Sequence, residues 1–395
     1  MEKIKDLCDK RVWRGKKLEE LRQLLEWMDS ITILQTVCSA DVELLSLKKG
    51  VVSAPGTLPF RRFSPFMGEL PGVALPLENA ENKERLAPLV KELKQNCLML
   101  MHGSDKFFTA DSLIPTMTQR IGAGGTNAGR PSFKRDAYFA ELLEVEEQDV
   151  KMLIRSIDGV KKVFAMHSAR YGFVPQTMIL DIVDQIEHGL GKPVCKYWEV
   201  TNARTEVYLE FPEKAADFAK TYGLPEKIVP GLKLITSDVG ESSVCAIGTW
   251  RRENVPLGYE VYTRKHVGKI EPDKVIEQIS QRIFAKYDRI PKRLCELMKI
   301  EVDSPIDCVD SIFEQIKVKD EIGVRRMPQL QSIMRDQFNY IVRYTAFDVA
   351  LALMALPDMV QGLPKGVQKK FTDCIAQAVF ADYEEYRTTL VAIPA

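Results

Sequence analysis

The chain has 395 residues, of which 45% are hydrophobic and 28% charged, so it is long enough for two or three domains with a sizeable core. Its 55 lysines and arginines balance 55 aspartates and glutamates. This balance excludes the strongly basic composition of many nucleic-acid-binding chains, but it allows a local basic surface.

The eight cysteines are scattered, and none stands two residues from another, as zinc motifs require. We therefore expect free thiols in a reducing compartment, no structural metal and no cofactor. The charged start of the chain, 1–17, does not resemble a signal peptide, and no apolar run approaches the length of a membrane span. These features predict a cytoplasmic protein with no membrane partner.

Residues 1–150 form the first of three predicted regions. Leucines at three- and four-residue spacing predict an amphipathic helix over 16–28. The Pro/Gly-rich stretch 51–77 excludes helix and predicts an extended segment. Its three phenylalanines indicate that it packs on its own chain or on a neighbouring copy and is not a free linker; they are Phe60, Phe63 and Phe66.

A glycine-rich basic loop follows at 119–136. Backbone N–H groups that glycine exposes can hold phosphates, and guanidinium groups add bidentate contacts. The loop fits neither the P-loop nor the dinucleotide-binding glycine pattern. A solvated surface loop is therefore the alternative to a phosphate site. Its candidate phosphate-binding cations are Arg120, Arg130, Lys134 and Arg135.

The second region, 151–270, alternates strand and helix patterns. Strands are predicted at 161–168, 194–200, 205–211, 232–238, 243–251 and 258–267, and helices at 175–189 and 213–222. The third region, 271–395, has helical periodicity throughout. The fold class predicted is α+β: a central, mostly antiparallel sheet with helical insertions, followed by an all-helical C-terminal region.

Basic and aromatic residues alternate at the ends of the last two predicted strands. Cations beside aromatic rings on a sheet are typical of single-stranded nucleic-acid binding, although a solvated strand end has the same composition. Alternation places Tyr259 and Tyr262 on opposite faces and Tyr262 with Arg264, which makes Tyr262 the better stacking candidate. The candidate residues here are Trp250, Arg251, Tyr262, Arg264, Lys265 and Lys269.

No complete catalytic motif is found. The four histidines form neither an H-x-x-x-H nor an H-E-x-x-H pair, and no G-x-S-x-G turn is present. Acidic pairs such as Asp181 and Asp184 are typical of solvated helix faces. We therefore expect a binding protein and assign no catalytic residue.

Three stretches, 167–186, 234–252 and 264–270, resemble a family common in phages and plasmids that is catalogued as domain of unknown function nine-three-two. They read HSARYGFVPQTMILDIVDQI, LITSDVGESSVCAIGTWRR and RKHVGKI. A Cys-Asn pair that is frequent in the family is replaced here by the segment 249–252. The resemblance implies a mobile-element protein of a bacterial host cell and brings no activity with it.

The leading hypothesis is a phage-associated protein that binds nucleic acid, including single-stranded DNA, in replication, recombination or DNA protection. The first alternative is a structural protein that assembles as a homo-oligomer, which the 51–77 segment would suit. The second is an enzyme that acts on nucleotides through the glycine-rich loop. Sequence alone does not choose between DNA and RNA.

Overall fold

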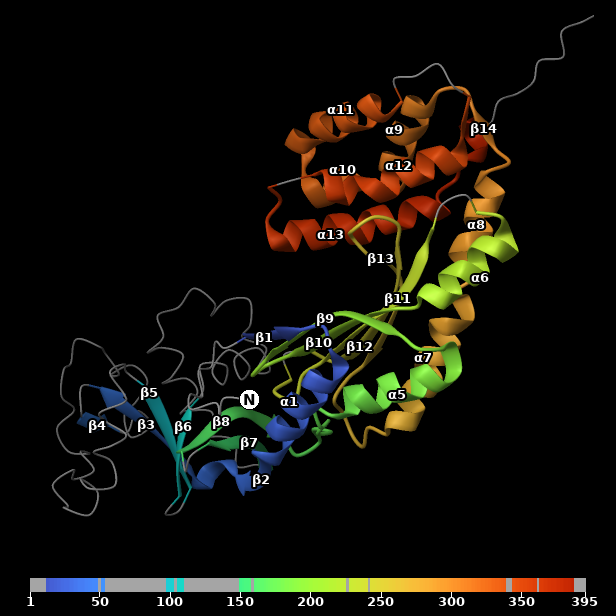
Figure 1. Ribbon diagram of the computed structural model, residues 1–395. Helices are drawn as coiled ribbons and strands as arrows, with labels where there is room; N and C mark the ends of the chain where they lie inside the picture. Colours follow the sequence, from blue (N-terminus) through green and yellow to red (C-terminus); the bar gives the residue numbers. More distant parts are fainter. Residues whose placement is uncertain are drawn as a thin grey trace, which may run out of the picture.

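The structure is a computed structural model, and it describes residues 12–48, 51–53, 97–102, 105–109, 149–157, 160–224, 227–240, 242–338, 343–360 and 362–386. Two predicted features lie outside these ranges: the extended segment 51–77, apart from its first three residues, and the glycine-rich loop 119–136. The α+β class is confirmed: a central antiparallel sheet is followed by a helical C-terminal region (Figure 1).

The central sheet has six antiparallel strands in the order β1-β9-β10-β11-β12-β13. Side chains alternate between its faces; Ala246 and Trp250 of β12 point into the core, whereas Cys245 and Ile247 point away. The strands are β1 (Val12–Gly15), β9 (Val194–Thr201), β10 (Thr205–Glu210), β11 (Val229–Thr236), β12 (Val244–Arg251) and β13 (Leu257–Arg264).

One bulge changes the alternation of β13. Gly248 pairs with Glu260 and Thr249 with Gly258, so Tyr259 is an extra residue in the register. Tyr259 and Tyr262 are therefore buried on the same face, and the prediction that they lie on opposite faces was wrong. A regular strand would have separated them; the bulge is not visible in the alternation pattern.

A second sheet has seven strands in the order β2-β7-β8-β6-β5-β3-β4. Among its described strands, the one parallel pair is β6 with β8. The strands are β2 (Thr32–Cys38), β3 (Val42–Lys48), β4 (Val51–Ser53), β5 (Cys97–His102), β6 (Asp105–Thr109), β7 (Asp149–Ile157) and β8 (Val160–Ser168). The predicted strand at 161–168 is therefore confirmed, but it joins strands of the N-terminal region and not the central sheet.

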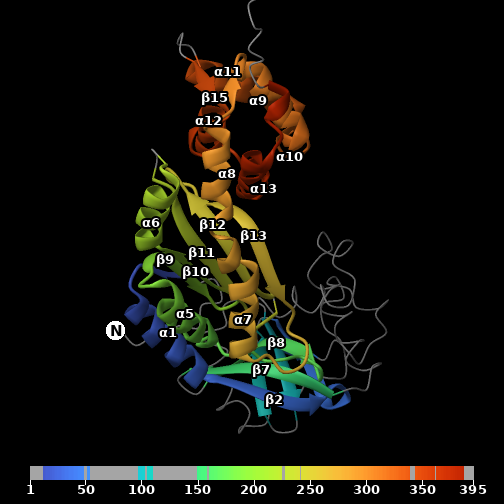
Figure 2. The same ribbon diagram turned by 90° about the vertical axis from the view of Figure 1, so that its right-hand side faces the viewer.

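Helices cover one face of the six-stranded sheet (Figures 1 and 2). Asp29, at the end of α1, accepts hydrogen bonds from the backbone N–H groups of Gln176 and Thr177 and so caps the start of α5. The covering helices are α1 (Leu18–Ser30), α5 (Met178–Leu190), α6 (Pro212–Tyr222), α7 (Pro272–Arg282) and α8 (Arg289–Leu297).

The C-terminal helices surround α12 (Ala346–Met359), which is buried along most of its length and begins with a capping box between Thr345 and Asp348. A two-stranded ladder, β14 (Glu301–Val302) with β15 (Tyr344–Thr345), ties the start of α12 to the end of α8. Its neighbours are α9 (Pro305–Gln315), α10 (Val318–Ile322), α11 (Met327–Gln337) and α13 (Lys365–Ile375).

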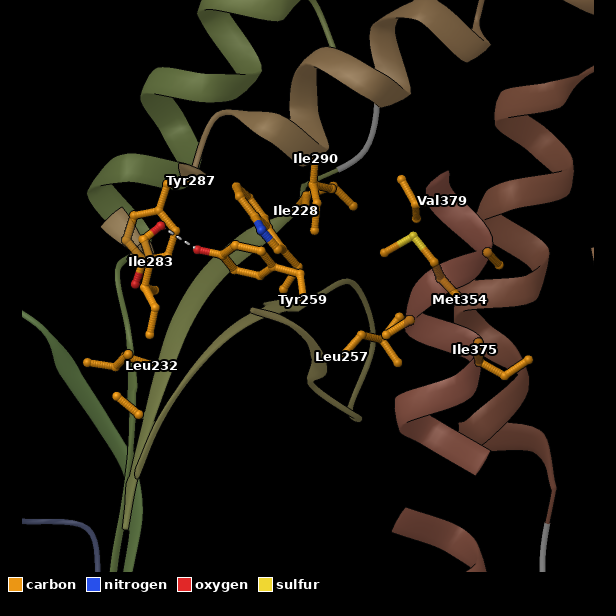
Figure 3. Close-up of a cluster of buried hydrophobic side chains, with 14 of the residues drawn as sticks. Ile228, Leu232, Leu257, Tyr259, Ile283, Tyr287, Ile290, Met354, Ile375 and Val379 are labelled. Carbon is orange, nitrogen blue, oxygen red and sulfur yellow. Dashed lines mark hydrogen bonds between the residues drawn. The ribbon is translucent and has the colours of Figure 1, made fainter. Parts of the chain in front are cut away.

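One apolar core joins the six-stranded sheet to these helices without a break. Figure 3 shows Leu257 of β13 facing Met354, Ile375 and Val379 of the helical region. On the other side of the same cluster, the hydroxyl of Tyr259 donates a hydrogen bond of 2.8 Å to the carbonyl of Ile283. The helices α12 and α13 are thus packed directly on the end of the sheet.

Candidate nucleic-acid interface

Three stretches of the chain, 167–186, 234–252 and 264–270, meet where the two sheets join. Tyr171, just after β8, forms an antiparallel bridge with Val267, after β13. Around that bridge the N–H of Gly172 donates to the carbonyl of His266 at 3.2 Å, and the N–H of Gly268 donates to the carbonyl of Arg170 at 3.1 Å. The loops 168–172 and 264–271 therefore form one continuous unit.

Three rings stack inside this joint. The His167 and Tyr171 rings lie 3.5 Å apart with an interplanar angle of 7°, and Tyr171 and His266 lie 5.2 Å apart at 4°. The Tyr171 hydroxyl donates to the backbone carbonyl of Asp238 at 2.8 Å, and His167 Nε2 lies 3.0 Å from the same oxygen. All three rings are buried, so the stack holds the loops together and offers no ring to a ligand.

A buried ion pair supports the stack. Arg155 of β7 and Asp238, after β11, are both fully buried, and Arg155 Nη2 donates to Asp238 Oδ2 at 2.5 Å. A second guanidinium nitrogen of Arg155 donates to the carbonyl of Asn202 at 2.7 Å. Because a buried charge without a partner is costly, this pair fixes how the two sheets meet.

Two glycines allow the loops to approach so closely. A Cβ on Gly172 would lie 1.9 Å from the carbonyl oxygen of Gly268, a distance that no side chain tolerates. Gly268 itself has a φ of +71°, in the left-handed region that favours glycine. The backbone contact at Gly268 therefore sets the positions of Lys265 and Lys269, the lysines before and after it in the loop.

Beside this joint, the end of β13 and the helix α7 enclose a cavity of about 350 Å³. Figure 2 shows β13 descending toward the seven-stranded sheet and α7 rising beside it. Among the described residues that line the cavity, four are cations and Glu271 alone is acidic. The lining residues are Tyr262, Thr263, Arg264, Lys269, Ile270, Glu271, Lys274, Val275, Gln278 and Arg282.

The cations of the cavity differ in how they are held. The guanidinium of Arg282 lies over the Tyr262 ring, 5.8 Å from its centre, within the range of a cation–π contact. Glu271 pairs with Lys274 at 2.6 Å and with Lys269 at 3.6 Å. Within the part of the chain that the structure describes, neither Arg264 nor Arg282 is paired with a carboxylate.

The pKa values reflect this crowding of positive charge. The Lys274 ammonium, through its hydrogen bond and its charge, lowers the pKa of Glu271, so Glu271 is ionised at neutral pH. Glu271 raises the pKa of Lys274, and the neighbouring positive charge of Arg264 lowers it by a smaller amount. Burial raises the pKa of Tyr262, against the effect of Arg264 and Arg282. The cavity is thus an electropositive site containing one fixed anion.

The structure brings some of the predicted residues together. Arg264 and Lys269 line the cavity, and Lys265 is exposed on the same loop. Arg251 lies on the open face of the sheet, where two of its three guanidinium nitrogens donate to Glu210. The remaining predicted cations, Arg120, Arg130, Lys134 and Arg135, lie outside the described residues.

The two predicted stacking residues are not available to a base. Trp250 is completely buried among aromatic rings of the core, with Phe218, Tyr259 and Tyr287 as neighbours. Tyr262 is 5% exposed and covered by Arg282. Their assignment as stacking surfaces was wrong, because strand alternation identifies a shared face but does not reveal that helices cover it.

Sequence reasoning missed Lys274 and Arg282 on α7 and Arg170 after β8. The signal for the first two was present: 274, 278 and 282 are spaced by four residues and so share one face of the helix. Arg170 gave no comparable signal, because its proximity to Gly268 depends on a contact between distant parts of the chain.

No family model, curated protein or solved structure matches the chain.

Among the residues that the structure describes, no group of three histidine, cysteine or acidic side chains is arranged to hold a metal ion. The described helices include none with the length and hydropathy needed to cross a membrane. Six cysteines of the described ranges are free thiols: Cys38, Cys195, Cys245, Cys295, Cys308 and Cys374.

Proposed function

We propose that this protein binds nucleic acid through the phosphate backbone, with the cavity between β13 and α7 as the central contact. The observation that carries the proposal is the pair of guanidinium groups, Arg264 and Arg282, held beside Lys269 and Lys274 around one hollow. Arginine forks match phosphate oxygens in bidentate geometry, and close cations without carboxylates gain most from an anionic ligand.

The proposed mode of recognition is backbone contact without base stacking. In the described part of the chain the exposed large apolar side chains are all aliphatic, and Trp250 and Tyr262 are buried. Single-strand binding proteins depend on exposed aromatic rings for much of their affinity. We therefore expect duplex and single-stranded ligands to bind with similar affinity at low salt.

The resemblance of the segment 166–270 to a phage and plasmid family supports a place in mobile-element DNA metabolism. The stretches that carry it build the joint and the loop from which Arg264 and Lys269 project. A role in recombination, replication or DNA protection fits a protein that contacts the backbone without reading bases. Bound phosphates would release counterions, so affinity should fall steeply as salt rises.

The test is fluorescence anisotropy with single- and double-stranded oligonucleotides over a range of salt concentrations. The double variant Arg264→Gln/Arg282→Gln should lower the salt slope by about two units, one for each lost phosphate contact. The matched control is Lys220→Gln, which removes an exposed cation from α6, a helix outside the cavity. Salt-independent binding, or no binding by the unaltered protein, would overturn the proposal and favour a homo-oligomeric assembly protein.

A further inference from the structure

The basic surface does not stop at the cavity. Arg170 is exposed on the loop after β8, and its carbonyl accepts a hydrogen bond from Gly268, the residue before Lys269. Lys151 of β7 reaches the same place, because its Nζ donates to the carbonyl of Tyr171 at 2.9 Å. Cations of the seven-stranded sheet therefore lie next to cations of the six-stranded sheet.

The ammonium group of Lys151 is engaged by a backbone carbonyl, but the guanidinium of Arg170 is available. No carboxylate in the described ranges pairs with it, and Ser168 and Ala169 beside it are also exposed. Arg170 is not among the residues that line the cavity. A ligand filling only the cavity would leave Arg170 unused.

We propose that Arg170 is a further phosphate-binding residue, and that the ligand is a polymer whose consecutive phosphates cross the joint between the two sheets. The inference rests on the proposed function and narrows it: a ligand confined to the cavity meets Arg264 but not Arg170, whereas a phosphate chain that extends beyond the cavity would meet both. Phosphates repeat about every 3.4 Å along one strand of duplex DNA, so each added nucleotide extends the reach of the ligand by about that step.

The two loops that carry Arg170 and Lys269 are held in fixed positions relative to each other, so their cations can contact one ligand together. The Tyr171–Val267 bridge, the two backbone hydrogen bonds beside it and the contact of Gly172 with Gly268 fix one loop against the other. The stacked rings of His167, Tyr171 and His266 lie beneath them. Because the geometry exists before the ligand arrives, little ordering of the loops is needed on binding.

The experiment is a length series, from a mononucleotide through a dinucleotide to longer oligonucleotides, titrated against the full chain and against Arg170→Gln, Arg170→Lys and Arg264→Gln. For long ligands, Arg170→Gln should reduce the salt slope by about one unit, and Arg170→Lys should restore it. For the mononucleotide, Arg170→Gln should bind as the unaltered protein does, while Arg264→Gln weakens binding at every length. Circular dichroism verifies that each variant is folded.

One result would overturn this inference and leave the proposed function standing: an unchanged salt slope for Arg170→Gln with long ligands while Arg264→Gln weakens their binding. A mononucleotide that binds as tightly as the longest oligonucleotide would define a small-ligand site and overturn both this inference and the proposed function. Absence of salt-dependent binding to any ligand by the unaltered protein would instead remove the proposed function itself.

Discussion

Two groups of cations, one on the six-stranded sheet and one between its last strand and α7, are held in opposite ways. On the face that the helices leave open, Glu206 pairs with Arg204 and Lys233, and Glu210 pairs with Arg251 and Lys196. At the end of β13, by contrast, Arg264 and Arg282 line a cavity and pair with no carboxylate in the described residues.

The difference separates structural charge from charge that can bind a ligand. A cation held by glutamate has already gained its electrostatic partner, and removing it disturbs the sheet. Cations gathered without carboxylates repel each other, and a bound polyanion would relieve that repulsion. The chain has no net charge, so pairing in space, and not composition, is what locates a candidate site.

The largest effect is expected where pairing is complete and buried. Asp238→Ala leaves the Arg155 guanidinium without its carboxylate in a site closed to water. We expect the free energy of unfolding to fall by about 3–5 kcal/mol, measured by urea denaturation. The double variant Arg155→Met/Asp238→Leu should recover much of this loss. A loss below about 1 kcal/mol for Asp238→Ala would show that the buried pair does not hold the joint.

The second largest loss of stability is expected on the open face of the sheet. Glu210 is 3% exposed and accepts hydrogen bonds from Arg251 and Tyr208. Glu210→Gln should cost about 1.5–3 kcal/mol of unfolding free energy, because charged hydrogen bonds are lost in a shielded place. The control is Glu199→Gln on the same sheet, where the pair with Arg14 is exposed and the cost should be about 0–1 kcal/mol. Equal losses at both positions would contradict the comparison.

The pairing of Glu210 with Arg251 should also make the stability of the protein depend on pH, with a smaller effect than the substitution. Burial alone would raise the pKa of Glu210, but its hydrogen bonds and charge contacts with Arg251 lower it overall from its ordinary value of 4.5. A lowered folded-state pKa adds stability above pH 4.5 that is lost as the pH falls through the folded-state value. The urea midpoint should therefore decline below about pH 4.5, less so in Glu210→Gln. An identical acid profile in the variant would count against the pairing.

The smallest effect on stability is expected in the cavity. Arg264→Gln removes an exposed cation that is paired with no carboxylate among the described residues, so the free energy of unfolding should stay within about 0.5 kcal/mol of the unaltered protein. Removing a neighbour that repels Lys274 also favours the folded state slightly. Thermal unfolding without nucleic acid measures this change. A loss above about 1 kcal/mol would mean that Arg264 is structural.

The helical third of the chain was predictable because helix periodicity is local. The helical periodicity predicted over 271–395 corresponds in the described residues to the helices α7 to α13, interrupted by the short β14–β15 ladder. Strand pairing is not local: nothing in the segment 161–168 shows that it pairs with 149–157 and not with 194–200. For that reason the central region was predicted as one sheet when it contributes to two.

The candidate site was predictable in part: its local sequence features were found, and the features that depend on tertiary contacts were not. Arg264, Lys265 and Lys269 stand out as a basic run, and the structure places Arg264 and Lys269 at the cavity. Which aromatic residues lie open to solvent depends on which face the helices cover, and so Trp250 was misjudged. The close approach of Gly172 to Gly268 could not be foreseen, because the two positions are nearly a hundred residues apart.

The continuous core beneath β13 has a consequence for modularity. The change from strands to helices near residue 271 looks like a domain boundary, yet Leu257 packs against Met354 and Ile375 across it. A chain ended there would expose a broad apolar surface on the sheet and would tend to aggregate. The C-terminal helices are thus not an exchangeable module: insertion, permutation or recombination should be tolerated better in surface turns than at this apparent border.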